Sequence, residues 1–258
     1  MRRLLLTLRY DGTHYHGWQV QPGVVTVQQV LQDAIQSVTG VRAGVIGCSR
    51  TDSGVHANMF CCTFDTESTV PIERMPLALN QHLPSDVAVY RCEEVALDFH
   101  PRYLAQGKRY CYHIWNDPCR NPFWDRYALR RTGRLDEQLL NRAAAAFVGT
   151  HDFAAFCAAG ADTASEDTVR TVSKAEVKRD GKLVTFTVEA DGFLYNMVRI
   201  MVGTLLDIAT GALPPDAIET ALETGRREDA GFTAPALGLF LEKVYYEEGK
   251  TDAEKTSS

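Results

Sequence analysis

The elements that decide the fold begin in residues 26–64, which read TVQQVLQDAIQSVTGVRAGVIGCSRTDSGVHANMFCCTF. Apolar residues recur at helical spacing over residues 26–40, Thr26 and Gln29 match a capping box, and Gly40 is placed as the helix stop. The next expected elements are a strand (43–48), a polar loop (49–57) and a second strand (58–64). This stretch therefore predicts a helix followed by two strands that share one polar loop.

Further strands and helices are expected on both sides of this stretch. Strands are expected at residues 1–12, 87–95, 110–115, 169–177, 183–189 and 239–246, and helices at 71–79, 136–147, 193–209 and just after Pro215. The two halves share this order without a repeated sequence, which predicts an α+β protein of two α/β domains with mixed, mostly antiparallel sheets flanked by helices. The expected domains span residues 1–105, which carry the polar loop, and 106–246, and residues 247–258 are expected to be a disordered polar tail.

Composition and charge argue against several classes of function. The formal net charge of −6 disfavours a protein that coats nucleic acid non-specifically, so a basic site would have to be local. Seven cysteines without a C-x-x-C pair argue against a disulfide framework or a zinc knuckle and are typical of a reducing cytoplasm. The apolar stretch at 193–209 carries Asn196, Arg199 and Asp207, so a buried helix is expected there and not a membrane span. The sequence patterns of P-loops, dinucleotide sites and zinc proteases are absent, and no metal site is expected.

The polar loop carries the first candidate for catalysis. Asp52 follows a predicted strand, Gly54 permits a tight backbone, and Arg50 lies two residues before the aspartate. A carboxylate at the end of a strand is presented on a rigid support, as a reactive group needs to be. The alternative is an ordinary turn, in which Asp52 caps its own backbone and Arg50 pairs with it.

A second segment, residues 101–134, combines cations with aromatic side chains. Its basic residues are Arg102, Lys108, Arg109, Arg120, Arg126, Arg130, Arg131 and Arg134, against the acidic residues Asp117 and Asp125. Within it, residues 108–115 (KRYCYHIW) alternate aromatic residues along a predicted strand. Cations interleaved with aromatic rings are typical of phosphate contact combined with base stacking. The alternative is a solvated charged face beside a partly buried strand.

Arg199 is the third candidate, because apolar residues surround it on both sides in the predicted helix. A partly desolvated guanidinium needs an anion, which is either a structural salt-bridge partner, a catalytic carboxylate or an RNA phosphate. An arginine held against Asp52 would keep that carboxylate ionised at neutral pH, the state a nucleophile needs.

Five motifs follow one another between about residue 5 and residue 245. They are YDGTHYHGWQVQ from Tyr10, SRTDSGVHA from Ser49, KRYCYHI from Lys108, HDFAAF from His151 and FLYNMVRIMVG from Phe193. Together they resemble the TruA-type tRNA pseudouridine synthases over nearly the whole chain. The chain departs from that family's usual pattern at Ser49, Ser53 and Pro101, and serine is small enough to fit both loop positions.

The resemblance implies the pseudouridine synthase fold, with a cleft between two domains. It also implies isomerisation of uridine to pseudouridine in the anticodon stem and loop, at tRNA positions 38, 39 and 40. No cofactor is expected, because the reaction is an isomerisation. The expected partners are tRNA and a second copy of the chain in a homodimer, without a membrane, and the expected location is cytoplasmic.

The resemblance also implies roles for four residues. Asp52 is the expected nucleophile, Arg199 its ion-pair partner, Arg50 a residue that displaces the base, and Tyr110 the ring that stacks on the target base. An enzyme that acts on a stacked base must first extrude it, which an aromatic platform and a cationic groove assist. Two alternatives stay open: a carboxylate-dependent hydrolase, for which Asp191 is the available second carboxylate, and a noncatalytic RNA-binding protein on the same scaffold.

Overall fold

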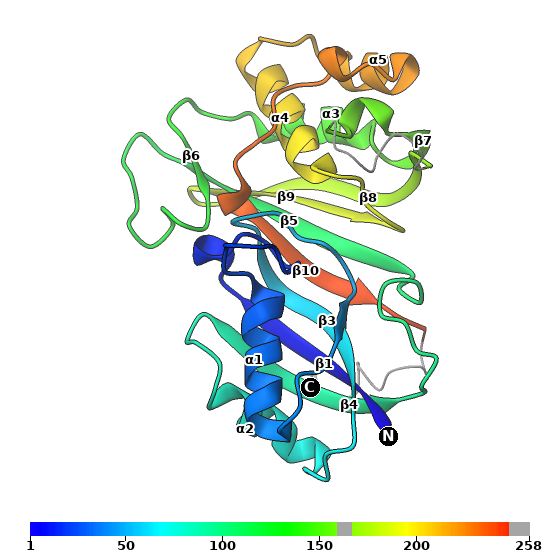
Figure 1. Cartoon of the computed structure of the whole chain (residues 1–258). Coiled ribbons are helices and arrows are strands. Elements are labelled where there is room, and N and C mark those ends of the chain that lie inside the picture. The colour runs from blue at the N-terminus through cyan, green and yellow to red at the C-terminus, as the bar shows by residue number, and fades with distance from the viewer. Residues whose placement is uncertain (159–166, 248–258) are drawn as a thin grey trace. The chain divides into compact units, whose positions relative to one another are not determined.

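The computed structural model describes residues 1–158 and 167–247. The chain divides into two compact units, one made of residues 1–107 with the segment from Leu241 onward, the other of residues 108–240. Both units combine a sheet with helices (Figure 1). The predicted domain limits, 1–105 and 106–246, differ from this division in the place of the last strand and remain a prediction. The predicted polar tail lies outside the described residues, apart from Glu247.

The sheet of the first unit is antiparallel and has β1 at its centre. It contains β1 (Arg2–Tyr10), β2 (Val45–Gly47), β3 (His56–Thr66) and β4 (Val87–Val95). β1 pairs with both β3 and β4, and β2 pairs with β3, so that Leu6 lies opposite Cys62 on one side and Cys92 on the other. Leu4, Leu5 and Leu6 are all buried, so both faces of β1 are covered. Such a strand shows a continuous apolar run and not an alternating one.

The helices of the first unit are α1 (Val27–Thr39) and α2 (Met75–Asn80), and they pack against each other. The predicted ends of α1 are confirmed. The Thr26 hydroxyl accepts a hydrogen bond from the Gln29 backbone N–H at 3.4 Å, and Gly40 has a left-handed conformation with φ of 79°. Leu31 and Ile35, one turn apart, are fully buried on the inner face.

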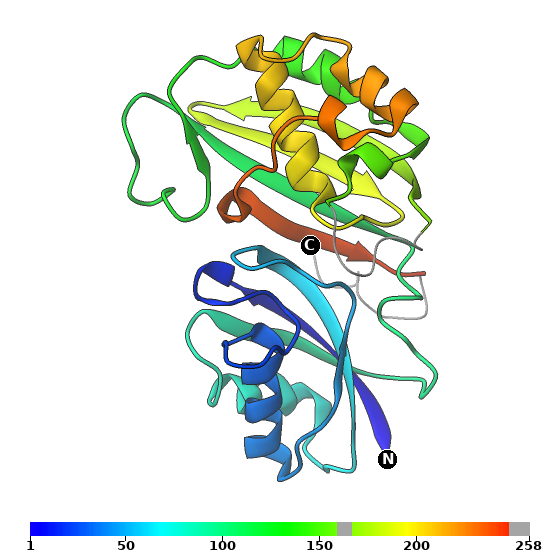
Figure 2. The same ribbon diagram turned by 45° about the horizontal axis from the view of Figure 1, so that its top comes forward.

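The sheet of the second unit carries its helices on one side (Figures 1 and 2). Its strands are β5 (Gly107–Asn116), β6 (Leu129–Arg131), β7 (Gly149–Asp152), β8 (Val169–Asp180) and β9 (Leu183–Ala190), and its helices are α3 (Glu137–Ala145), α4 (Met197–Thr210) and α5 (Ala217–Thr224). β5, β9, β8 and β7 pair in that order, all antiparallel, whereas β6 runs parallel to β5. The last strand, β10 (Leu239–Tyr245), has residues in both units. The α+β class with mixed, mostly antiparallel pairing is therefore confirmed.

Two predicted helix boundaries are wrong. α4 begins at Met197 and not at residue 193, because Asn196 has φ of 61°, a left-handed conformation that cannot lie inside an α-helix. α3 ends at Ala145, and Gly149, predicted as its stop, begins β7 with φ of 123°. Among the helices of residues 1–158 and 167–247, none is long and apolar enough to cross a membrane.

Candidate active site

The loop that carries Asp52 connects β2 to β3, and its backbone is fixed on both sides of the aspartate. The Trp18 N–H donates to the Thr51 carbonyl at 3.1 Å, and the Gly54 N–H donates to the Tyr15 carbonyl at 3.2 Å. The Val55 N–H donates to the Asp52 carbonyl at 3.1 Å and closes a tight turn, in which Gly54 has φ of 78°. The segment after β1 thus holds the aspartate loop through main-chain bonds that do not use the Asp52 side chain.

Two glycines of that segment lie against the loop backbone. A Cβ atom placed on Gly12 would come within 2.0 Å of the Val55 carbonyl oxygen. One placed on Gly17, which has φ of 80°, would come within 2.5 Å of the Thr51 carbonyl oxygen. Both approaches are too close for any side chain, so glycine is required at both positions. We call residues 10–18 the brace of the Asp52 loop.

Buried side chains add to the brace. The Tyr10 hydroxyl lies 2.8 Å from the Thr51 hydroxyl, and both residues are buried. His56, only 1% exposed, accepts a hydrogen bond from the Gly12 N–H on its Nδ1 at 3.0 Å, and the same atom lies 3.1 Å from an Asp11 carboxylate oxygen. A carboxylate on such a support keeps its orientation while a substrate binds, which favours catalysis.

Tyr15 is anchored from outside the loop. Its hydroxyl donates to the Asp86 carboxylate at 2.5 Å, and burial together with this bond raises the pKa of Tyr15, so the phenol remains the donor. The Tyr15 carbonyl also accepts a hydrogen bond from the Ser53 hydroxyl at 3.3 Å. Ser53, one of the departures from the family pattern, is therefore accommodated by the same support. Arg50, the other predicted residue of this loop, is exposed.

The second unit carries Tyr110 and Arg199. Tyr110 lies in β5 opposite Val188, and its ring meets Phe193 edge to face, with centroids 5.0 Å apart. Arg199 lies in the first turn of α4 and is half-buried. Its Nε donates to the Ala234 carbonyl at 2.7 Å, and its Nη1 donates to the Asn196 side-chain oxygen at 2.6 Å.

The four predicted residues thus form two pairs, each within one unit. Asp52 and Arg50 share one loop of the first unit, and Tyr110 and Arg199 belong to the second. The expected ion pair between Asp52 and Arg199 would connect the two units, and the expected cleft would lie between the two domains. Both remain predictions. Asp191, the second carboxylate considered for a hydrolase, is exposed and accepts a hydrogen bond from the Thr171 N–H at 3.1 Å, which ties the end of β9 to β8.

The sequence motifs do not predict the structural role of the brace. The run YDGTHYHGW supports only the family resemblance, although its two glycines, Gly12 and Gly17, among mostly large side chains were the available signal. Of the basic segment, Arg109 forms an ion pair with Glu189 at 2.9 Å in the structure, while Arg126, Arg130 and Arg134 are exposed. Across the described residues, no three histidine, cysteine, aspartate or glutamate side chains gather as a metal ion would require.

Comparison with known proteins identifies the family of this chain. A family model described as tRNA pseudouridine synthase matches residues 7–104 and 143–247. The chain belongs to the tRNA pseudouridine synthase family, whose members are isomerases that act on tRNA. Proteins named tRNA pseudouridine synthase A from Acetivibrio thermocellus and Moorella thermoacetica are 44% and 46% identical to it. These alignments cover 95% and 94% of this chain and 100% and 99% of the relatives, so the resemblance seen in the five motifs is confirmed.

Proposed function

We propose that this protein isomerises uridine to pseudouridine at positions 38, 39 and 40 of tRNA, in the anticodon stem and loop, without a cofactor. The braced Asp52 loop is the observation that carries the proposal, because it presents a carboxylate on backbone that the first unit holds rigid. Similarity to full-length relatives named tRNA pseudouridine synthase A supports the substrate. We propose also that the protein acts as a homodimer in the cytoplasm, which the family resemblance supports.

In the proposed reaction, Asp52 attacks the target uridine as the nucleophile. The N1–C1′ bond breaks, the base turns, a new bond joins C5 to C1′, and the bond that Asp52 formed breaks, so that its carboxylate is restored. The hydrogen on C5 leaves as a proton and N1 gains a proton, so product and substrate have the same atoms and no oxidant or reductant is needed. In this proposal Arg199 keeps the carboxylate ionised, Arg50 occupies the space that the base leaves, and Tyr110 holds the base by stacking.

The substrate positions are tested by mapping the product. A tRNA transcript with uridine at 38, 39 and 40 is incubated with the enzyme, treated with carbodiimide and read by primer extension. We expect stops that report pseudouridine at these positions, and none in a matched transcript with cytidine there. Modification confined to another part of the tRNA would contradict the proposed positions.

Substitution of Tyr110 tests the stacking role. Tyr110→Phe keeps the ring and its edge contact with Phe193, so kcat/KM should fall by less than about threefold. Tyr110→Ala removes a stacking contact worth on the order of 1–3 kcal/mol and should lower kcat/KM by about 5- to 150-fold. Thermal melting of both variants shows how much of a loss comes from weaker packing against Phe193. The remainder is then the lost stacking on the target base. Equal losses in the two variants would show that the hydroxyl, and not the ring face, is what matters.

A further inference from the structure

The loop between β5 and β6, in the second unit, contains none of the four predicted site residues. Residues 117–128, which we call the β5–β6 loop, join two parallel strands in which Ile114 pairs with Leu129 and Asn116 with Arg131. A parallel neighbour starts at the far end of the paired stretch, so the chain has to travel back before it enters β6. The loop consists of turns and bends, and Figure 1 shows the chain around β6 standing out from the helices and sheet of this unit.

The β5–β6 loop is anchored to the strands that it joins. The rings of Trp115 and Trp124 stack with centroids 6.5 Å apart and planes inclined by 14°. The Trp115 indole N–H donates to the Cys119 carbonyl at 3.1 Å, and the Arg130 guanidinium donates to the Pro118 carbonyl at 2.9 Å. These contacts fix the conformation of the loop. Binding therefore avoids the entropy cost of ordering a flexible loop.

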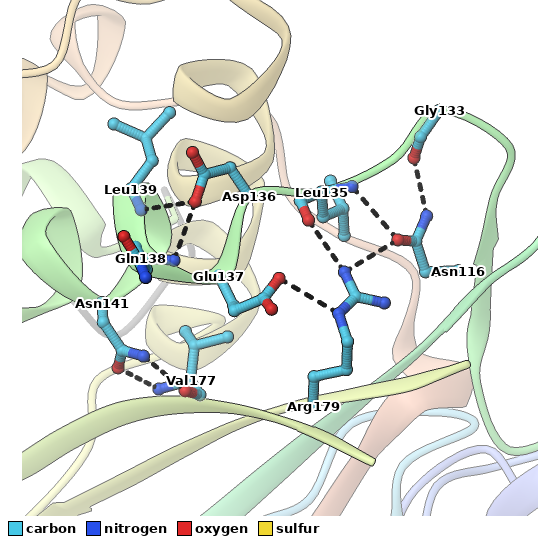
Figure 3. Close-up of polar contacts among 10 residues, drawn as sticks. All are labelled: Asn116, Gly133, Leu135, Asp136, Glu137, Gln138, Leu139, Asn141, Val177 and Arg179. Atoms are coloured by element: carbon cyan, nitrogen blue, oxygen red, sulfur yellow. Dashed lines mark hydrogen bonds and ion pairs between the residues drawn. The ribbon is translucent and has the colours of Figure 1, made fainter. Parts of the chain in front are cut away.

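The end of β5 is also tied to the chain that follows β6 (Figure 3). The Asn116 amide donates to the Gly133 carbonyl at 2.6 Å, and its oxygen accepts from Arg179 at 3.1 Å. Arg179 also donates to the Leu135 carbonyl at 2.8 Å and pairs with Glu137 at 3.1 Å. The segments on both sides of the β5–β6 loop are therefore held to one another.

Phe123, in the middle of the β5–β6 loop, is exposed to solvent. Its side chain is 86% exposed, although phenylalanine is among the residues most often buried. The Phe123 N–H donates to the Asn121 side-chain oxygen at 3.1 Å, and the Asn121 carbonyl accepts from Trp124 and Asp125 at 2.9 and 3.0 Å. An Asx turn thus fixes the backbone from which the ring projects.

The surroundings of Phe123 are basic. Residues 117–134 contain five arginines and two aspartates in a chain whose net charge is −6. Both aspartates have cationic partners, with Arg120 at 2.7 Å from Asp125 and Lys182 at 2.5 Å from Asp117. Three further arginines are exposed: Arg126, Arg130 and Arg134. An exposed ring in a segment with exposed arginine residues offers both a stacking face and phosphate contacts.

We propose, resting on the function proposed above, that the β5–β6 loop is a second RNA-binding site, in which Phe123 stacks on an unpaired base and the neighbouring arginines contact phosphates. Trp124 packs on His113 and Trp115, whose side chains lie on the face of β5 opposite to that of Tyr110, since successive strand residues point to opposite faces. Phe123 and Tyr110 therefore hold different nucleotides. The loop supplies affinity for the tRNA and takes no part in the chemical step.

Charge favours RNA over a second copy of the chain as the occupant. A two-fold contact in which this loop met its own copy would bring two arginine-rich surfaces together, and like charges repel. A polyanion instead neutralises them and releases counterions. RNA also supplies unpaired bases, which are planar partners for an exposed ring.

The test is tRNA binding and turnover by full-length Phe123→Ala. We expect the Kd for a tRNA transcript and the KM to rise together, by about 5- to 150-fold, with kcat unchanged, because the ring contacts bound RNA equally in the ground and transition states. Phe123→Tyr keeps an aromatic face and should bind like wild type. Leu77→Ala, a matched control at a 68% exposed apolar residue of the first unit, should have no effect. In Arg126→Gln/Arg134→Gln, which leaves the Arg130 anchor in place, the slope of log Kd against log salt should fall in magnitude by about 1 to 2.

Three outcomes would overturn the proposal. The Kd of Phe123→Ala could equal that of wild type, kcat could fall while KM stays constant, or light scattering could show that the variant loses a dimer that wild type forms. The last outcome would assign the loop to a second copy of the chain. A wild-type protein that makes no pseudouridine but binds tRNA through Phe123 would contradict the proposed function and leave the RNA-binding role of the loop supported.

Discussion

Asp52→Asn is expected to abolish pseudouridine formation, with a fall in rate of about 10⁴-fold or more, while tRNA binding stays within a few fold of wild type. Asparagine has the shape of aspartate but neither its charge nor its nucleophilic oxygen. The contacts that fix the loop use the carbonyls of Thr51 and Asp52 and the Gly54 N–H, so they persist in the variant. The measurement is tritium release from tRNA labelled with [5-³H]uridine, without added metal or nucleotide, alongside a binding assay.

A second variant excludes a false result from deamidation of the introduced asparagine. Asp52→Ala removes the carboxylate in a form that cannot revert by deamidation, and it should be equally inactive. Near wild-type turnover in either variant would show that Asp52 is not the nucleophile. If wild type itself released no tritium while it bound tRNA tightly, the chain would be an RNA-binding protein that keeps the family's scaffold without its chemistry.

Elements with local signals were predictable from the sequence. α1 has its cap, its apolar face and its terminal glycine within fifteen consecutive residues, and the structure has it at Val27–Thr39. The start of α4 was misplaced because its apolar run extends past Asn196, whose left-handed backbone conformation leaves no mark in a hydrophobic pattern. β6 and β7 are absent from the predicted strands, because they have only three and four residues, too few to show an alternating apolar pattern.

The residues of the candidate site also differ in whether a local sequence pattern identifies them. Asp52 could be singled out from its own loop, since a carboxylate, a glycine and an arginine lie within five residues. The brace joins residues about 40 positions apart, as in the bond between Tyr10 and Thr51, and no pattern within either segment encodes that contact. The ion pair expected between Asp52 and Arg199 would join two compact units, so it depends on tertiary structure that neither motif carries.

Gly17→Ala tests whether the brace positions the nucleophile, and Gly23 provides a matched control. Both glycines have nearly the same backbone conformation, with φ of 80° and 78°, so alanine at either site carries a similar strain of about 1–2 kcal/mol. A Cβ on Gly17 would lie 2.5 Å from the Thr51 carbonyl oxygen, whereas one on Gly23 meets no atom within 4 Å. Only Gly17→Ala therefore has to displace the loop that carries Asp52.

We expect Gly17→Ala to lower the single-turnover rate by about 100-fold, because a shift of about 1 Å in a reacting group has an effect of that size. Gly23→Ala should keep the wild-type rate. Both variants should lose the thermal stability that the left-handed backbone conformation costs an alanine, and Gly17→Ala should lose more, because it also displaces the loop. tRNA binding should change little in either, since the brace acts on the orientation of the carboxylate. A Gly17→Ala protein that is folded and as fast as the Gly23→Ala protein would show that the brace supports the fold and not the chemistry. A rate loss confined to Gly17→Ala, in protein that is folded at the assay temperature, would instead make the close approach of residues 10–18 part of the catalytic apparatus, because the control carries the same backbone strain without that approach.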